Sequence, residues 1–592
     1  MSDFLYHSEV QPHGVLAGCL RDIYHADPPE VMEYHGDWGS LAVSRNLYNG
    51  FQPYETDSHL FVMIGGPVLT FRDNRFLTGD DPSAGTVSVF ERYRNGSIMW
   101  DEDLSGPFAV LIVDKQKRIV RCITDLMLFI PVYVLSGDDD QTVALGTHPD
   151  ALAYATDQQD ALDKISMIDF ILTNVVTFPY TTYTRIRQCE PAAVHEYHPY
   201  SDTAEKKKPS LYWKPLEENR FNSISEAAET LRNEVTGYIR RVTESMDHVA
   251  MFISGGEDSR VIAGLLPRDL KKDGFVFLDS MNREGRLARN VAQVLGLQFH
   301  LGQRKTTHYL DILPQACNLM GSGQQCIHAH TLGFYKSCEL DRFPAVFGGF
   351  LANSMLKSGG MRKTKIQRKL TFLPEVGLKG EGHSKPMHSN IFNRKALNEI
   401  DRRRRDHLKR IAEYRSESLH PWFLFWPRTM GFANANIAVN RRLFRSYEPF
   451  TSNGVVKICA VTPESWKRNR RLFNKAFRQA QKPVKWIPHS KGGYPYFPSW
   501  VNIPFQFHYW LQKKIRNRLG IRQQYDGPWI DWASLMETGE WKSRIEKCNK
   551  DFLENTFGGY IDDPIAAANS SNWKLAVKIN LIQTHYFQNR KR

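Results

Sequence analysis

The stretch Val249-Ala-Met-Phe-Ile-Ser-Gly-Gly-Glu-Asp-Ser-Arg-Val-Ile-Ala-Gly-Leu-Leu266 decides the expected fold of the chain. Its first five residues form an apolar run typical of a fully buried parallel strand, and Arg260 to Leu266 is compatible with a helix that Pro267 ends. Between them lies the polar segment 254–259. A strand, a glycine turn and a helix N-terminus bring free backbone N–H groups and the positive end of a helix dipole around one point. The stretch therefore predicts an anion-binding site at the carboxyl end of a strand.

Each residue of this segment has an expected role. Gly255 and Gly256 let the backbone approach an anion closely, and Ser254 and Ser259 add hydroxyl donors. Asp258 stands where a carboxylate can hold a hard cation. We therefore expect these five residues to bind a polyphosphate, with magnesium on Asp258.

The motif Ser254-Gly-Gly-x-Asp-Ser259 after a buried strand resembles the pyrophosphate-binding loop of N-type ATP pyrophosphatases, and the surrounding chain resembles the asparagine synthetase family. It differs from the nucleoside-triphosphate P-loop, because no Gly-Lys-Ser/Thr follows the glycines. The resemblance implies an α/β chain with two domains. The N-terminal domain would be a sheet domain like those of Ntn hydrolases and class II amidotransferases. The C-terminal domain would be a parallel-sheet PP-loop synthetase domain, similar to the adenine nucleotide alpha-hydrolases. It implies ATP and Mg²⁺ as cofactors. A generic anion-binding turn is the alternative for so short a motif.

Composition narrows the class of protein. The chain has 592 residues, 42% of them apolar and 24% charged, which is typical of a globular protein with more than one domain. No apolar run reaches the roughly 18 residues of a membrane span, so we expect a cytoplasmic protein without a membrane partner. The eight cysteines are scattered without a Cys-x-x-Cys pair, which argues against a zinc ribbon or a disulfide scaffold. A net charge of +13 would suit a nucleic-acid partner, but solvated basic faces are the interpretation that we favour.

Residues 1–205 contain short strand-like runs separated by turn clusters, which predicts a sheet-dominated first domain. The ordered series from Leu104 to Leu152 resembles the glutamine amidotransferase domain of asparagine synthetases. Active domains of that type use an N-terminal cysteine as the nucleophile. Here position 2 is Ser2 and the nearest cysteine is Cys19. The first domain is therefore predicted to be glutaminase-inactive, with a structural or substrate-binding role.

A polar stretch from Tyr200 to Pro209 is the expected linker, and residues 206–592 form the expected ATP-binding domain with a helical C-terminal part. Ser223-x-x-Glu226 is a capping box ahead of an amphipathic helix. Beyond the loop, the predicted elements are a strand at 274–279, a helix at 285–295 and a strand that begins at 299–301. Such alternation predicts a parallel sheet with its ligands at the carboxyl ends of the strands.

The chain departs from the family after the strand-like run that begins at Ala345. In relatives the matching turn carries an acidic pair, one member of which shares magnesium with the first loop; here Ala352 and Asn353 take those places. Asn353 can ligate magnesium only weakly through its amide oxygen. Lys491 matches the family lysine that stabilises charge during adenylation and acyl transfer, and a plain mobile surface loop is its alternative. Glu284 matches an acidic family position, or is a solvated residue at a helix start.

The resemblance implies that a carboxylate attacks the α-phosphorus of ATP, and that an amine then displaces AMP to form an amide. Without a glutaminase the amine is ammonia, a second substrate or part of the same molecule, as in β-lactam synthetases and lasso-peptide macrolactam cyclases. Tyr447 and Glu448 are adjacent, unlike the base dyad of the β-lactam enzymes, so neither is assigned as base. The expected partner is a small-molecule or peptide carboxylate. A degenerate binding protein, a nucleic-acid-modifying enzyme and an ammonia-using asparagine synthetase are the alternatives, and a homodimer stays open.

Overall fold

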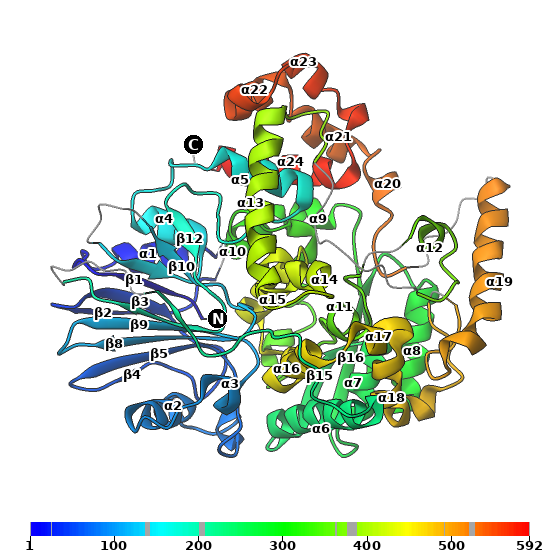
Figure 1. Cartoon of the computed structure of the whole chain (residues 1–592), viewed down its shortest axis with the longest axis horizontal. Helices are drawn as coiled ribbons and strands as arrows, with labels where there is room; N and C mark the ends of the chain where they lie inside the picture. Colours follow the sequence, from blue (N-terminus) through cyan, green and yellow to red (C-terminus); the bar gives the residue numbers. More distant parts are fainter. Residues whose placement is uncertain are drawn as a thin grey trace.

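The computed structural model describes residues 2–24, 27–136, 142–200, 208–361, 364–375, 387–490, 492–519 and 527–590. These residues form a mixed α/β structure with two six-stranded antiparallel sheets, one five-stranded parallel sheet and a two-stranded ribbon of β6 (Val68–Leu69) and β7 (Leu104–Ser105) (Figure 1). The antiparallel sheets lie in the N-terminal half and the parallel sheet in the C-terminal half. Of the helices in these ranges, none is both long and apolar enough to cross a bilayer.

The two antiparallel sheets stack face to face. The first has the order β12 (Ile186–Gln188), β10 (Tyr133–Leu135), β11 (Ala144–Gly146), β1 (Phe4–His7), β3 (Gly39–Ser44), β2 (Val31–Gly36). The second has the order β14 (Ser210–Leu211), β13 (Ala193–Tyr197), β9 (Ile119–Thr124), β8 (Phe108–Asp114), β5 (His59–Gly65), β4 (Tyr54–Glu55). Alternate residues of each strand point to opposite faces. Phe4 and Tyr6 therefore enter the core between the sheets, whereas Leu5 enters the core on the outer face.

Helices cover both outer faces of this double sheet. On the side of the first sheet, α1 (Val15–Arg21), α4 (Pro149–Ala155) and α5 (Lys164–Thr173) share a core with Leu5 and Ala42. On the side of the second, α2 (Ala84–Arg94) packs Val89 and Phe90 against the strands. The sheet-dominated N-terminal half predicted from the sequence is thus present, and its helices cover the outer face of each sheet.

The parallel sheet has the order β17 (Gln298–Gln303), β16 (Lys271–Leu278), β15 (His248–Phe252), β18 (Val346–Phe347), β19 (Ser446–Tyr447). Helices α6 (Ile224–Thr243), α7 (Glu257–Leu265), α8 (Arg283–Leu295) and α18 (Arg471–Gln481) share one core with Val249 and Met251 of β15. On the other face, Ala250 joins the core that holds α10 (Leu313–Met320) and α15 (Asn434–Leu443). The central strand is therefore apolar on both sides, which explains its continuous apolar sequence.

The predicted alternation after the loop is confirmed. The second strand begins three residues earlier than expected, at Lys271, and the helix begins at Arg283. Half of the expected capping box forms at α6: the Ser223 side chain accepts from the N–H of Glu226. The Glu226 carboxylate instead accepts from the N–H of Asn222, one residue earlier than the pattern requires. Its helix face is buried as predicted along Ala228, Leu231, Val235, Ile239 and Val242.

The C-terminal region is helical and reaches back onto the N-terminal half. Besides α15 and α18, its helices of eight or more residues within the described ranges are α13 (Arg394–Ala412), α16 (Asn453–Val461), α19 (Ser499–Arg518), α21 (Gly539–Glu546), α22 (Lys550–Phe557) and α24 (Leu575–Asn589). The side chain of Asn580 in α24 donates to the carbonyl oxygens of Phe170 and Ile171 in α5, at 3.1 Å each. In Figure 1, α13 stands between the antiparallel sheets and the parallel-sheet half, and α19 lies at the outer edge.

A buried ion cluster also joins the two halves. Asp3, next to β1, accepts from Arg441 at 2.9 Å and from Arg442 at 2.7 Å, and both arginines belong to α15. Burial raises the pKa of Asp3, but the two guanidinium groups outweigh it and hold that pKa well below its usual range. The expected boundary near residue 205 remains a prediction, because residues 201–207 lie outside the described ranges. The cores on either side of that boundary are continuous.

Candidate functional site

A cleft of about 410 Å³ opens at the carboxyl ends of β15, β16 and β18. Ser254, Asp258 and Ser259 line one part of it. The structure therefore brings together three of the five residues predicted to bind phosphate, at the sheet edge where a parallel sheet is expected to bind ligands.

Hydrogen bonds hold the loop after β15 in a compact shape. The Ser254 N–H donates to the Ser259 hydroxyl at 3.1 Å, and the two serine hydroxyls lie 2.9 Å apart. The Gly256 N–H donates to the Ser254 hydroxyl at 3.1 Å. Both hydroxyls are thus placed at the start of α7.

Two buried side chains hold Gly255 from either side. Glu284 accepts from its N–H at 2.6 Å, so the acidic position after β16 is a support for the loop and is not a solvated helix start. Arg260 donates to its carbonyl oxygen at 3.1 Å and to that of Ile487 at 2.6 Å. Burial lowers the pKa of Arg260 to about 10, which leaves it charged at neutral pH.

The N-terminus of α7 has no side-chain cap. Its N-cap residue is Gly256, and among the described residues no side chain bonds to the first N–H groups of the helix. The N–H groups of Glu257, Asp258 and Ser259 therefore have no partner within the helix. A Cβ at Gly349, in the turn after β18, would lie 2.9 Å from the Cβ of Asp258, so this turn can approach only because it is glycine. Three oriented donors at the positive end of a helix dipole suit an anion.

Four charged side chains surround this helix start. Lys357 contacts the carboxylate of Asp258 and lies 3.3 Å from that of Glu257, and Arg470 also contacts Glu257. Lys357 is 8% exposed and its ammonium lies 4.7 Å from the centre of the Phe473 ring. The two cations balance the two carboxylates. The sequence analysis missed Lys357 and Arg470, which lie 99 and 213 positions from their partners and carry no local signal.

The predicted magnesium ligands do not form a common site. Asn353, in α11 (Ala352–Leu356), is exposed and does not line the cleft. Asp258 contacts Lys357, so a metal ion there would have to displace an ammonium group. These residues do not fit a magnesium site shared between two protein side chains.

Lys491 lies outside the described residues, so its predicted catalytic role stays a prediction. Its described neighbours lie close to α7. Arg260 donates to the carbonyl oxygen of Pro488 at 2.6 Å, and the His489 N–H donates to Gly493 at 2.7 Å.

Glu448 is a further residue of the cleft. It follows β19 and is 5% exposed; one carboxylate oxygen accepts from the N–H of Phe350 at 2.9 Å. Burial raises the pKa of Glu448 to about 8, against the lowering effect of the Phe350 N–H. A carboxyl group that titrates near neutral pH in a cleft is suited to acid–base chemistry. The sequence analysis did not assign Glu448 as a base, because Tyr447 and Glu448 are adjacent, unlike the base dyad of the β-lactam enzymes.

The remainder of the cleft is largely aromatic. Phe252, Phe275, Phe277 and Trp529 line it, together with His330. Burial lowers the pKa of His330 to about 3, so this imidazole is neutral at physiological pH. Flat apolar walls suit a heteroaromatic base or an apolar chain, and Arg304, which also lines the cleft, adds a positive charge.

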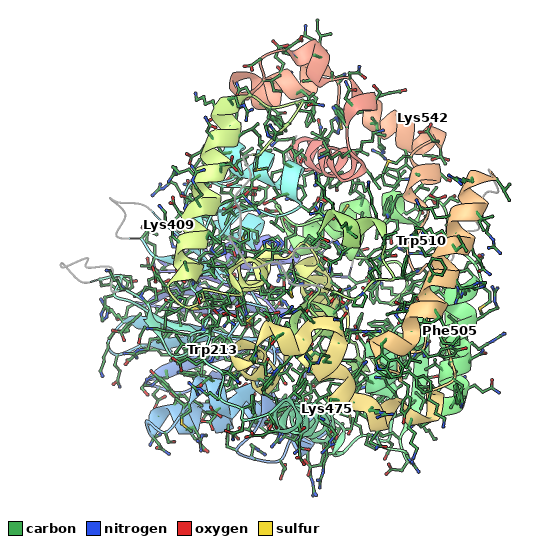
Figure 2. All side chains as sticks on the ribbon, turned by 45° about the vertical axis from the view of Figure 1, so that its right-hand side comes forward. Trp213, Lys409, Lys475, Phe505, Trp510 and Lys542 are labelled. Carbon is green, nitrogen blue, oxygen red and sulfur yellow. The ribbon has the colours of Figure 1, made fainter. Side chains whose placement is uncertain are left out.

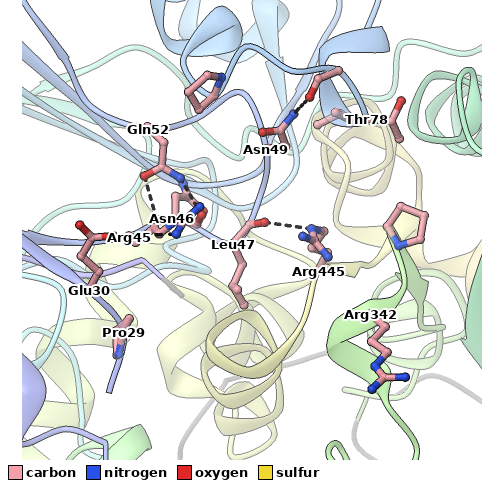
Figure 3. A pocket seen from close by; sticks show the side chains of 14 residues that line it. Pro29, Glu30, Arg45, Asn46, Leu47, Asn49, Gln52, Thr78, Arg342 and Arg445 are labelled. Atoms are coloured by element: carbon pink, nitrogen blue, oxygen red, sulfur yellow. Dashed lines mark hydrogen bonds and ion pairs between the residues drawn. The ribbon is translucent and has the colours of Figure 1, made fainter. Parts of the chain in front are cut away.

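A larger cavity of about 680 Å³ lies between the two halves (Figure 3). Its polar side chains are mainly bonded to the protein itself. Arg445 donates to the carbonyl oxygen of Leu47 at 2.9 Å, and Gln52 donates to that of Asn46 at 2.8 Å. It contains none of the predicted site residues, and we do not assign it a function.

The N-terminal residues offer no activated nucleophile among the described ranges. Ser2 is buried, and its hydroxyl accepts from the Gly65 N–H at 3.0 Å. Burial raises the pKa of Cys19 to about 11, so this side chain is a neutral thiol at physiological pH. The absence of glutaminase activity from the first half stays a prediction.

No protein-family model matches the chain, and no curated protein sequence matches it. Among solved structures, one match is described as the allosteric regulatory enzyme of purine biosynthesis, with 10% identity over 51% of this chain and 80% of that chain and a TM-score of 0.24. Another is the glutamine phosphoribosylpyrophosphate amidotransferase of B. subtilis, with 9% identity over 51% of this chain and 66% of that chain and a TM-score of 0.20. Both matched proteins are enzymes. TM-scores this low add nothing to the argument from the site.

Proposed function

We propose that the chain is an ATP-dependent, AMP-forming synthetase that adenylates a carboxylate and transfers the acyl group to an amine. The observation that carries the proposal is the uncapped N-terminus of α7, which opens into the cleft with Lys357 and Arg470 beside it. Within this proposal the parallel-sheet half is a PP-loop synthetase domain and the antiparallel half is amidotransferase-like.

In the first step, an oxygen of the substrate carboxylate attacks the α-phosphorus of ATP, and the bond to pyrophosphate breaks. Negative charge builds up on phosphoryl oxygens, so preorganised donors lower the barrier. The N–H groups of Glu257, Asp258 and Ser259 and the two serine hydroxyls are such donors. The aromatic part of the cleft would take the adenine.

Lys357 supplies positive charge beside the phosphates, a task that relatives give to a shared metal ion. Asp258 is a carboxylate for the Mg²⁺ that accompanies ATP only if Lys357 moves away from it. No step proposed here depends on a metal held by the protein, and Lys491 keeps its proposed role of stabilising the transition state.

In the second step, an amine attacks the acyl-adenylate and AMP leaves. The amine must lose a proton, and the ionised form of Glu448, whose fraction grows as pH rises towards its pKa of about 8, can accept it. The choice between ammonia and a larger amine is proposed from the N-terminal half, which holds no activated nucleophile in its described residues. An amine on a second substrate or within the same molecule is therefore proposed, as in β-lactam synthetases and lasso-peptide cyclases.

The substrate is proposed to be a small-molecule or peptide carboxylate. Helix α19 follows the segment that Arg260 holds, and it exposes Trp500, Phe505 and Phe507. Figure 2 shows the labelled Phe505 and Trp510 on this helix. Exposed aromatic side chains favour a peptide over a small polar acid.

A non-catalytic binding protein is the second candidate. It is favoured by the position of Asn353 away from the cleft and by the contact between Asp258 and Lys357, which would disfavour metal-assisted turnover. A nucleic-acid-modifying enzyme remains a third candidate on the net charge of +13 alone.

The proposal is tested with purified protein, Mg²⁺, α-labelled ATP and fractions of peptides and small carboxylates from the host. Formation of AMP and pyrophosphate by the wild type, and its loss in Asp258→Ala, would support adenylation. Nucleotide binding without turnover in every fraction would instead support the binding protein. Formation of ADP, or the absence of nucleotide binding, would refute the synthetase.

A further inference from the structure

A second group of chemically reactive side chains lies in the N-terminal half, on the edge strand of the first antiparallel sheet. Within the described ranges, His13, Glu33 and His35 form a group whose ligand atoms all lie within 4.8 Å of one another. His13 lies just before α1. Glu33 and His35 are alternate residues of β2 and therefore share one face of that strand.

The spacing of the three atoms fits a tetrahedral metal ion. His13 Nδ1 lies 3.4 Å from His35 Nε2 and 2.6 Å from Glu33 Oε2, and His35 Nε2 lies 4.0 Å from the same oxygen. With zinc–ligand bonds of about 2.1 Å, the edge of a tetrahedron is roughly 3.4 Å. One distance equals that edge and the other two lie on either side of it, so shifts of less than about 1 Å in the side chains would complete the geometry.

Hydrogen bonds alone cannot pair all three of these ligand atoms at once. A single proton on His13 Nδ1 can be donated to Glu33 or to His35, but not fully to both. A divalent ion can accept the lone pairs of both imidazoles and one carboxylate oxygen at the same time.

Other residues hold the two less exposed members in place. His35 Nδ1 lies 2.9 Å from the Ser40 hydroxyl, which also accepts from the N–H of Gln11 at 2.8 Å. When Nδ1 donates to Ser40, Nε2 presents its lone pair to the group, which is the usual support of a metal-bound histidine.

The Glu33 carboxylate is fixed as well. Its side chain is 4% exposed and accepts from the N–H groups of Gly14 at 2.8 Å and of Ala17 at 3.1 Å. Only His13, whose side chain is 84% exposed, is free to adjust. Two preset ligands and one adjustable ligand at the surface make a site that an ion can enter from solvent.

We propose that His13 Nδ1, His35 Nε2 and one oxygen of Glu33 bind a Zn²⁺ ion, with water completing the coordination. Two nitrogen ligands and one carboxylate suit zinc and related transition metals, whereas Mg²⁺ and Ca²⁺ prefer oxygen ligands alone. The bound ion links the segment before α1 to β2, so its role is to stabilise the packing of this segment against the edge strand of the first sheet. The proposal does not depend on the synthetase function.

The test is a zinc titration of the metal-free full-length protein against a chromophoric zinc indicator, with thermal unfolding measured in parallel. We expect one equivalent of Zn²⁺ to bind and the unfolding temperature to rise with zinc concentration. His13→Ala and Glu33→Gln should weaken the binding at least about tenfold, and Ser40→Ala should weaken it less, because Ser40 only orients His35. His13→Ala is the main variant, since an exposed side chain can be removed without harm to the fold.

The matched control is His248→Ala. His248 and His300 both contact Asp273 on the parallel sheet. Like His13→Ala, this variant therefore deletes an exposed histidine that contacts a carboxylate. Zinc binding that persists in His248→Ala and fails in His13→Ala supports the proposal. Absence of zinc binding by the wild type, or binding that His13→Ala and Glu33→Gln leave unchanged, overturns it.

Discussion

Lys357 and Glu448 are the residues on which the chemistry proposed for the cleft depends most. Lys357 neutralises Asp258 and Glu257 beside the start of α7, and Glu448 is a buried carboxyl group with one oxygen bound to a backbone N–H. Removing the first should change the binding of phosphate. Removing the second should change how stability and rate depend on pH.

Lys357→Ala should weaken ATP binding at least about tenfold, because one charge-assisted contact contributes roughly 1.5 to 3 kcal/mol and two carboxylates lose their partner. Lys357→Arg should retain part of the affinity. Lys475→Ala, which removes an exposed lysine of α18 that Figure 2 labels, is the matched control and should bind as the wild type does. Equilibrium dialysis with ATP gives the affinities. Equal affinity of Lys357→Ala and the wild type would rule out the proposed role.

Glu448→Gln should stabilise the protein increasingly as pH rises. Since burial raises the folded-state pKa to about 8, above an unfolded value of about 4.3, the folded state binds more protons between these values. Stability of the wild type therefore falls as pH rises through this window, by at most about 1.4 kcal/mol per pH unit from this group. Glutamine does not titrate, so Glu448→Gln lacks this dependence of stability on pH.

Urea unfolding at pH 5, 7 and 9 measures the difference between Glu448→Gln and the wild type. Glu229→Gln replaces an exposed glutamate of α6 and should show no such trend. A difference for Glu448→Gln that stays constant with pH would mean that this carboxyl group is ionised in the folded protein at neutral pH.

At the scale of elements, α7 is fixed from both ends. Its start is set by Glu284, Arg260 and the turn at Gly349, and its last turn packs against α18. A Cβ at Gly264 of α7 would lie 2.4 Å from the carbonyl oxygen of Ala480 in α18, so the two helices approach closely only through glycine. The position of the phosphate-binding donors therefore depends on this helix pair.

Gly264→Ala should destabilise the protein by about 1 to 3 kcal/mol, because the added methyl group meets backbone that cannot move aside. Gly237→Ala is the matched control in α6, where the added Cβ would have only the end of the Arg241 side chain, at 3.5 Å. It should stabilise the helix by up to about 1 kcal/mol. Urea unfolding of the two variants should give changes of opposite sign; equal changes would contradict the close contact.

The strand, turn and helix at 249–266 could be predicted from the sequence because each signal there is local. A buried parallel strand must be apolar, and glycine beside polar residues marks the turn. Asp258 and Asn353 could be named as metal candidates from the resemblance, but their separation could not be foreseen. Lys357 reaches Asp258 from 99 positions away, and the Phe350 N–H that contacts Glu448 lies 98 positions from it. Such long-range contacts have no local pattern.

At the scale of the whole molecule, the two halves share cores and the ion cluster around Asp3. Asp3 is fully buried, and Arg441 and Arg442 of α15 both donate to it. Loss of its charge would leave two guanidinium groups buried without their partner. The assembly of the halves should therefore depend on this one carboxylate.

Asp3→Asn should cost about 3 to 5 kcal/mol of stability at neutral pH. Because the folded-state pKa of Asp3 is depressed, the wild-type contribution is present above about pH 4 and is lost as pH falls below it, so the two proteins should converge in acid. Asp37→Asn removes an exposed partner of Arg118 and should cost less than about 1 kcal/mol. Unfolding curves at pH 7 and pH 3 measure these losses of stability. If Asp3→Asn lost no more stability than Asp37→Asn at pH 7, the proposed role of the ion cluster would be contradicted.

The most direct measurement is an experimental structure with an ATP analogue that cannot be cleaved between the α- and β-phosphates. The predicted result is a nucleotide in the cleft at the ends of β15, β16 and β18, with phosphate oxygens bonded to the N–H groups of residues 257–259 and Lys357 turned towards them. A nucleotide bound elsewhere, or an empty cleft at a saturating concentration of the analogue, would contradict the proposed synthetase.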